Sequence, residues 1–231
     1  MQLNIFSGGA AQAVVGGLQK DFEAAHGCTL AGTFNAVGAM RDAVVAGQPC
    51  DLVILSASLI ASMTREGHLV EGSSAAVGGV ATSVAVRSGT APVQVGTGEE
   101  LRQTLAGCQG LFVPHLTQST AGQHVAAVLK KLGLDEVLQD RIHEFPNGAT
   151  AMAALARTTG EGMVGCTQAT EIMYTAGIDL VADLPQDYGL VTVYTAAVCA
   201  RAAQPALAAA FRDLLCGAGT RAQREAAGFR V

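Results

Sequence analysis

The hydrophobic positions of this chain form short apolar runs that alternate with amphipathic segments. The stretch from Phe112 to Gly133 shows the pattern most clearly, as an apolar run, a polar loop and a segment that ends at a glycine. Within that segment Val125, Val128, Leu129 and Leu132 recur at three- and four-residue spacing. This spacing places the four side chains on one face of a helix. The stretch therefore predicts a strand followed by a helix that packs on a sheet.

The same order of strand, polar loop and helix recurs along the chain. Strands are expected at residues 3–6, 29–34, 51–55, 111–113, 142–145 and 162–166. The run Asp51–Leu55 is almost continuously apolar, as is typical of a central strand covered on both faces. Regular alternation of strands and helices predicts parallel pairing with right-handed crossovers.

Two longer extended segments interrupt this alternation. Val80–Val86 has no helix directly after it, and Leu190–Cys199 is a second long β-type run. We interpret the first as the passage into a second lobe and the second as the return. The sequence thus predicts an α/β fold with two lobes, each a mostly parallel sheet flanked by helices. Residues 1–83 with 195–231 are expected to form lobe I and residues 84–194 lobe II, with a ligand cleft between them.

Composition and charge exclude several function classes. The formal net charge is −5, and the 14 lysines and arginines form no basic run. This argues against nucleic acid and against an anionic membrane surface as partners. No apolar stretch reaches the length of about 18 residues that a membrane span needs, so direct membrane insertion is not expected. No metal-ligand spacing and no nucleotide-binding motif is present, so we predict neither a metal nor a cofactor.

The cysteines bear on the compartment. None of the six lies in a CxxC pair, and each sits in or beside an apolar run, which predicts buried free thiols. Gln2 is followed directly by an apolar strand, without the pattern of a signal peptide. As written, the sequence predicts a cytoplasmic protein. A periplasmic location is the alternative if a leader was removed.

The polar loops after the strands are the candidate binding site. In doubly wound sheets the ligand lies outside the carboxyl ends of the strands, and helix N-termini attract anions. These loops offer mainly neutral donors, and Arg41 is the only guanidinium near them; it is either a bidentate carboxylate clamp or part of a solvated helix face. The predicted ligand-binding residues are Ser7, Gly8, Gly9, Ala10, Asn35, Val37, Gly38, Arg41, Thr117, Ser119, Thr120, Ala121, Asn147, Gly148, Ala149, Thr167 and Gln168.

Two residues could carry proton chemistry if the protein is an enzyme. His115 stands in a loop of the expected site, where it could donate to a carboxylate or move a proton next to one. Its alternative role is a hydrogen bond to the backbone. Cys166 is expected at a strand end beside a helix N-terminus, a position that lowers a thiol pKa. Its alternative role is that of a small buried residue under the loop.

Several motifs together resemble a known family. They include Leu3–Ala10 (LNIFSGGA), Ala46–Ile54 (AGQPCDLVI), Ser119–Gly122 (STAG), Gly165–Ile172 (GCTQATEI) and Val191–Val198 (VTVYTAAV). The chain resembles the type II periplasmic binding proteins, specifically the molybdate-binding receptors of ABC transporters and a divergent branch that includes aconitate isomerase. This resemblance implies a two-lobe fold hinged by two extended crossings. It also implies a small anionic ligand and an ABC-transporter membrane subunit as partner.

The chain departs from that family at the ligand. Molybdate receptors are expected to place serine hydroxyls in the first two loops and a tyrosine after the strand that contains residue 165. Ala10, Gly38 and Gly165 stand at those places here. A small di- or tricarboxylate is therefore a ligand candidate beside the tetrahedral oxyanions.

Three hypotheses about function follow. The first is a non-catalytic receptor that closes its lobes around a small anion. The second is an isomerase that shifts a proton in a small unsaturated di- or tricarboxylate, with His115 or Cys166 as acid and base and Arg41 as the clamp. The third is a ligand-sensing module in the cytoplasm.

Overall fold

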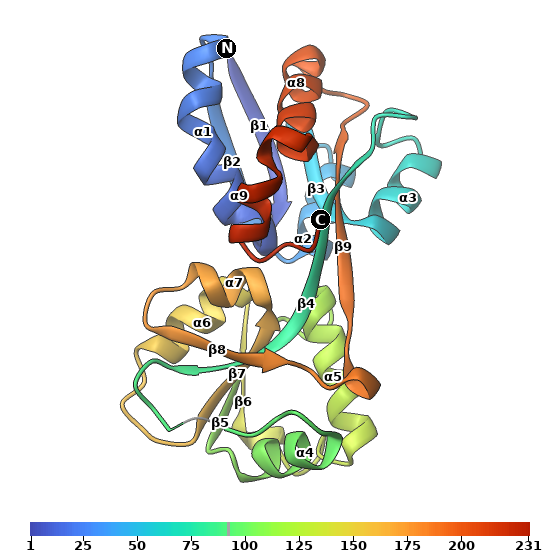
Figure 1. Cartoon of the computed structure of the whole chain (residues 1–231). Helices are drawn as coiled ribbons and strands as arrows, with labels where there is room; N and C mark the ends of the chain where they lie inside the picture. Colours follow the sequence, from blue (N-terminus) through green and yellow to red (C-terminus); the bar gives the residue numbers. More distant parts are fainter. Residues whose placement is uncertain (92) are drawn as a thin grey trace. The chain divides into compact units, whose positions relative to one another are not determined.

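The computed structural model describes residues 1–91 and 93–231, and these form two compact units. Unit 1 comprises Met1–Val80 and Thr192–Val231, and unit 2 comprises Ala81–Val191. Strand β4 (Ala75–Arg87) carries the chain out of unit 1, and β9 (Val191–Val198) carries it back (Figure 1). Both passages are extended strands, as the sequence predicts.

The sheet of unit 1 contains three neighbouring parallel strands. The central one, β1 (Gln2–Gly8), pairs in parallel with β2 (Thr29–Asn35) on one side and with β3 (Leu52–Ser56) on the other. On its far side β3 pairs with β9 in the antiparallel sense. The carboxyl ends of β1, β2 and β3 therefore share one edge, which we call the unit 1 edge.

Helices cover this sheet because their apolar stripes need burial. In the first long helix Val14, Leu18 and Phe22 are buried, and the helix ends at Gly27, whose φ of 58° suits a glycine. The ring of Phe22 meets that of Phe211 edge-on, with centroids 4.9 Å apart. The helices of unit 1 are η1 (Gly9–Ala11), α1 (Gln12–His26), α2 (Val37–Val45), α3 (Ala57–Arg65), α8 (Pro205–Cys216), η4 (Ala218–Thr220) and α9 (Arg221–Ala226).

Unit 2 repeats the arrangement around another central strand. β5 (Gly110–Pro114) pairs in parallel with β6 (Ile142–Phe145) and with β7 (Met163–Gln168). β4 pairs antiparallel with β7 and with β8 (Ile178–Asp183). The carboxyl ends of β5, β6 and β7 form the unit 2 edge.

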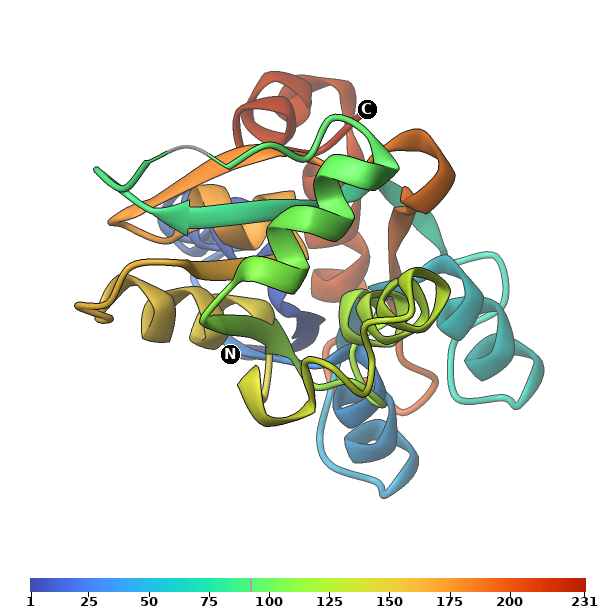
Figure 2. The same ribbon diagram turned by 90° about the horizontal axis from the view of Figure 1, so that it is seen from below.

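Two apolar cores lie on the two faces of this sheet. Leu111 and Val113 of β5 join one core, whereas Phe112 between them joins the other, as the two-residue period of a strand requires. The helices of unit 2, several of which are seen in Figure 2, are α4 (Gly98–Gly107), α5 (Thr120–Leu132), η2 (Gln139–Arg141), α6 (Gly148–Ala156), α7 (Ala169–Tyr174) and η3 (Gln186–Tyr188). Side chains of α4 and α5 enter the first core, and those of α6 and α7 enter the second.

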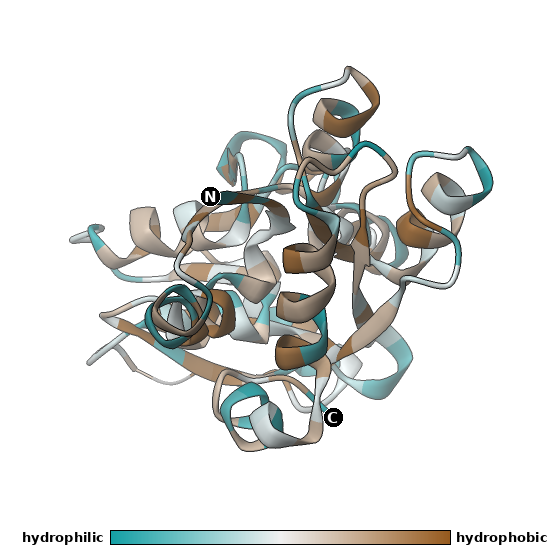
Figure 3. Cartoon of the chain, turned by 90° about the horizontal axis from the view of Figure 1, so that it is seen from above, coloured by the Kyte–Doolittle hydropathy of each residue, from teal (hydrophilic) through white to brown (hydrophobic). Residues whose placement is uncertain are grey.

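The predicted stripe of α5 is confirmed. Val125, Val128 and Leu129 are buried, Ser119 is the N-cap, and Gly133 ends the helix with a φ of 67°. Figure 3 shows hydrophobic and hydrophilic residues alternating around the helices in this way.

One boundary differs from the expectation. The sequence predicts that this strand ends at residue 166, but Thr167 and Gln168 extend β7 and pair with Ser83 and Thr82 of β4. The helix α7 begins only at Ala169. Backbone pairing with a long neighbouring strand outweighs the local helix signal, and it leaves Cys166 inside the strand rather than at its end.

The close approach of α6 to β7 explains why residue 165 is a glycine. A Cβ atom added there would lie 2.5 Å from Cε of Met152 and 2.9 Å from Cδ2 of Leu155. Both neighbours are fully buried side chains of α6. The tyrosine that the family resemblance implies near this position would have no room under α6.

We expect Gly165→Ala to destabilise the protein by about 1–2 kcal/mol, because the added methyl group overpacks the α6–β7 contact. The matched control is Gly17→Ala on α1, where a Cβ atom meets nothing within 4 Å. That exchange should stabilise the helix by about 0.5–1 kcal/mol. Urea unfolding measures both changes in the free energy of unfolding. A gain in stability for both variants would contradict the packing account.

Candidate functional site

At the unit 1 edge, the loops after β1 and β2 meet each other. A Cβ atom on Gly8 would lie 2.8 Å from Cγ1 of Val37 and 2.9 Å from Cε1 of Tyr194. Gly8 ends β1, Val37 begins α2, and Tyr194 lies on β9. The structure thus brings Ser7–Ala10 together with Asn35, Val37 and Gly38, all of which were predicted as ligand-binding residues.

The helices that start at this edge offer backbone N–H groups. Among the described residues, no side chain caps η1, α2 or α3 by a hydrogen bond. The side chain of Asn35 instead accepts from the N–H of Ala36 at 2.8 Å, one residue before α2 begins. Uncapped helix starts carry partial positive charge and donor groups, which suit an anion.

Two predicted residues of unit 1 are engaged in other contacts. Ser7 is fully buried, and its hydroxyl donates to the carbonyl oxygen of Gly8 at 2.8 Å. Arg41 lies on α2 and donates from Nε to Oδ1 of Asp42 at 2.8 Å, with 43% of its side chain exposed. In this conformation Arg41 has the contacts of a solvated helix face.

At the unit 2 edge, His115 follows β5 and meets a carboxylate from β6. Its Nδ1 lies 3.2 Å from Oε1 of Glu144, and the N–H of Thr117 approaches the same ring nitrogen at 3.3 Å. The loop that holds His115 packs directly on α5. A Cβ atom on Gly122 would lie 2.3 Å from the carbonyl oxygen of His115, so only glycine allows this approach.

The starts of α5 and α6 lie beside this pair and carry the other predicted residues. Ser119 accepts from the N–H of Gly122 at 3.4 Å, with Thr120 and Ala121 opening the helix. Asn147 caps α6 in a reciprocal box with Thr150, accepting from its N–H at 2.9 Å. Both helix starts thus carry a side-chain cap, unlike those of unit 1.

A buried carboxyl group occupies the start of α6. Oε1 of Glu171 accepts from the N–H of Gly148 at 3.2 Å, and Oε2 accepts from the hydroxyl of Thr167 at 2.6 Å. A Cβ atom on Gly148 would lie only 2.0 Å from Oε2 of Glu171. An internal acid therefore holds Gly148 and Thr167, two predicted ligand-binding residues.

Burial raises the pKa of the Glu171 carboxyl, although its hydrogen bonds with Thr167, Gly148, Ala149 and Gln168 act in the opposite direction. Desolvation disfavours the charged form, and only 5% of this residue is exposed.

The pKa expectation for Cys166 is wrong. Burial raises the pKa of the Cys166 thiol to about 12 instead of lowering it. The thiol is inside β7 and belongs to the core between the sheet and α5, so no helix N-terminus stabilises its thiolate.

Sequence reasoning missed three features of the two edges. Ser56 and Ser58 end β3 and open α3, and their hydroxyls lie 3.3 Å apart at the unit 1 edge. Glu144 and Glu171 are the other two. The third occurrence of strand, polar loop and helix could have indicated the serines, and the four-residue spacing from Thr167 could have indicated Glu171.

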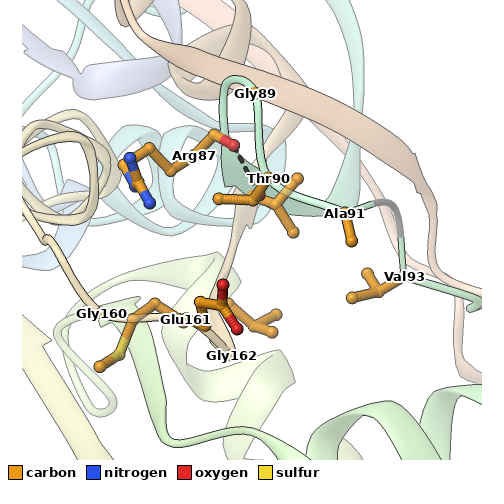
Figure 4. Close-up of a pocket in the computed structure, with 11 residues that line it drawn as sticks. Arg87, Gly89, Thr90, Ala91, Val93, Gly160, Glu161 and Gly162 are labelled. Carbon is orange, nitrogen blue, oxygen red and sulfur yellow. Dashed lines mark hydrogen bonds between the residues drawn. The ribbon is translucent and has the colours of Figure 1, made fainter.

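A pocket of about 360 Å³ in unit 2 lies away from the unit 2 edge (Figure 4). It is lined by Met163 and Val164, at the amino end of β7, and by Arg87 and Glu161 among others. The predicted residues of β7 are at its opposite end.

Glu171→Gln tests the buried acid. The folded protein keeps a proton on Glu171 at pH values where the unfolded chain has lost it, since the folded pKa is the higher one. Wild-type stability should thus fall as the pH rises above about 4.5, by up to about 1.4 kcal/mol per pH unit until Glu171 ionises.

The variant should lack this component of the pH dependence, as measured by urea unfolding at a series of pH values. Glu136→Gln, which removes an exposed carboxylate, is the control and should keep the wild-type slope. Identical pH profiles for wild type and Glu171→Gln would rule out a raised pKa.

Comparison with known proteins gives the family. The model of the bacterial extracellular solute-binding proteins matches residues 3–230. Among curated proteins, an aconitate isomerase of Pseudomonas sp. is 24% identical over 178 residues, which cover 77% of this chain. The match spans 66% of that relative, just under two thirds of its length.

The fold also matches solved structures. The periplasmic molybdate-binding protein of Azotobacter vinelandii superposes with a TM-score of 0.83 at 19% identity, covering 99% of both chains. A sulfate-binding protein of Mycobacterium tuberculosis gives a TM-score of 0.75 at 18% identity, covering 100% of this chain and 86% of the other. The expected periplasmic-binding-protein fold is confirmed. In the described residues, no helix is long and apolar enough to span a membrane. With nearly its whole length matched, the chain belongs to the bacterial extracellular solute-binding proteins.

Proposed function

We propose that this protein is a receptor for a small anion, which it binds at the unit 1 edge. The observation that carries this proposal is that, among the described residues, no side chain caps the starts of η1 and α2, which meet where Gly8 packs against Val37. Anions bind such groups without a countercharge. In unit 2 the start of α5, with Thr117, Ser119, Thr120 and Ala121, offers donor groups of the same kind.

The ligand that fits best is a small carboxylate or oxyanion. The predicted residues offer neutral donors, and Arg41 is held by Asp42. Glu171 already occupies the start of α6, so an anion at Asn147, Gly148 and Ala149 would lie beside an internal acid. A membrane subunit of an ABC transporter is the partner expected of such a receptor. The family's description as extracellular favours the periplasmic alternative for its location.

A thermal-shift screen tests the ligand class. Molybdate, tungstate, sulfate, citrate, cis-aconitate and trans-aconitate are compared at fixed protein concentration. A ligand at a hundred times its Kd stabilises the native state by about 2.7 kcal/mol, which corresponds to a rise in Tm of about 5–10 °C. Stabilisation by molybdate or tungstate alone would rule out the carboxylate, and no shift with any of these anions would count against the receptor.

Gly38→Asp should abolish anion binding without unfolding the protein. The new carboxylate would lie in the first turn of α2, where it stabilises the helix but takes the place of the ligand. We expect at least a tenfold loss of affinity in calorimetric titration with whichever anion the screen identifies. Gly17→Asp introduces the same charge on the exposed face of α1 and should bind like the wild type. Equal affinity for both variants would contradict a site at α2.

A second candidate function, isomerisation of a small unsaturated di- or tricarboxylate, has one structural observation in its favour. His115 and Glu144 form a close imidazole–carboxylate pair at the unit 2 edge. Such a pair can remove a proton from the carbon next to a substrate carboxylate and return one at the far end of the double bond. The similarity to an aconitate isomerase supports this alternative.

Proton exchange in heavy water distinguishes an enzyme from a receptor. With cis- or trans-aconitate, an isomerase incorporates deuterium into the substrate, and His115→Ala should lower the rate at least a hundredfold. Cys166→Ala should keep the wild-type rate, because the thiol is buried and protonated. NMR spectroscopy of the substrate measures the incorporation. Absence of exchange by the wild type would leave the receptor as the only function proposed here.

A further inference from the structure

Cys50 and Cys199 lie side by side at the end of the unit 1 sheet that is opposite the proposed anion site. Cys50 precedes β3 and Cys199 follows β9, two strands that pair with Leu52 opposite Val198. The N–H of Cys199 donates to the carbonyl oxygen of Asp51 at 2.9 Å, which continues this register. Cys50 is the residue before Asp51, so the two cysteines lie on adjacent segments at this end of the sheet.

The two thiols influence each other electrostatically. A hydrogen bond with Cys50, together with burial and the nearby charge of Asp51, raises the pKa of the Cys199 thiol. Cys50 and Cys199 are 6% and 3% exposed, so both sulfur atoms lie just beneath the surface.

The carboxylate of Asp51 holds the backbone segments that carry the two cysteines. Its Oδ2 accepts from the N–H of Asn4 at 2.8 Å, and its Oδ1 accepts from the N–H of Gln204 at 2.9 Å. The carboxylate thereby ties the beginning of β3 to β1 and to the segment after β9. The positions of the thiols therefore do not depend on a covalent bond between them.

A pocket gives access to both sulfur atoms. Its volume is about 370 Å³, and Cys50 and Cys199 line it together with Gln48, Glu66, His68 and Arg201, among others. The lining carries both acidic and basic groups, so a small uncharged polar molecule can enter without a large electrostatic barrier. The volume is sufficient for a small aliphatic disulfide.

We propose that Cys50 and Cys199 are a redox pair, which small disulfide compounds entering this pocket convert reversibly into an intramolecular disulfide. One cysteine attacks the small disulfide as its thiolate, forms a mixed disulfide and releases one small thiol. The second cysteine, as its thiolate, attacks the protein sulfur of that mixed disulfide and releases the other small thiol. The two protons of the protein thiols end on the two small thiols. The protein is oxidised by two electrons, and the small disulfide is reduced by two.

Oxidation should stabilise the protein. The disulfide would join positions separated by roughly 150 residues, and it would restrict the unfolded chain across all of them. We expect the Tm to rise by about 5 °C or more and to return on reduction with dithiothreitol.

The experiment treats the whole protein with 2-hydroxyethyl disulfide at pH 8. Thiols counted under denaturing conditions should fall from six to four per chain. Digestion with trypsin and chymotrypsin separates Cys199 from Cys166, because Tyr194 lies between them. Mass spectrometry should then find the peptides of Cys50 and Cys199 joined.

Three variants make the result specific. Once any mixed disulfide has been removed, Cys50→Ser and Cys199→Ser should each retain five titratable thiols. Neither variant should show a linked peptide or a rise in Tm. Cys28→Ser, also buried in unit 1, is the control and should lose two thiols as the wild type does. If Cys50→Ser or Cys199→Ser fails to fold, the linked peptide of the wild type still shows whether Cys50 and Cys199 form a disulfide. Six free thiols after treatment, or a linked peptide that contains another cysteine, would overturn the redox pair.

Discussion

Parallel pairing on both sides of one central strand is the constraint on which each unit depends. Because β1 and β5 each lie between two parallel partners, three chain segments must leave the sheet at the same edge. Each segment continues into a helix. The strand order alone therefore brings the helix N-termini to the same edge. In both units the gathering of helix starts at one edge is therefore a consequence of strand order, and particular side chains only modify the surface that they form.

The two edges use this property differently. At the unit 1 edge no side chain of the described residues caps the helix starts η1 and α2, and the residues around them are mainly glycine and alanine. At the unit 2 edge Ser119 and Asn147 cap their helices, and Glu171 places a carboxyl group against the start of α6. A raised pKa keeps this acid a neutral partner over part of the acidic range, so it does not repel an anion there. One unit thus offers open donor groups, and the other offers groups whose charge varies with pH.

Much of the fold could be predicted from the sequence because the signals were local. The stripe of α5, the N-cap at Ser119 and the glycine at its end all appear within fifteen consecutive residues. The errors arose where distant residues decide. Thr167 and Gln168 extend β7 because β4 pairs with them, and Cys166 loses the expected helix N-terminus for the same reason. The four-residue spacing from Thr167 could indicate Glu171, but not its contact with Gly148, which lies 23 positions earlier.

The alternation along β5 also determines which sequence changes the family can accept. Leu111 and Val113 belong to one core, and Phe112 belongs to the other. Deleting a single residue from this strand would exchange the two sets, placing Phe112 where the helices α4 and α5 leave room for smaller side chains. Related sequences should therefore keep the length of β5 and the order of side-chain sizes along it. Insertions and deletions should collect in the loops at the amino ends of the parallel strands, where neither core nor edge is disturbed.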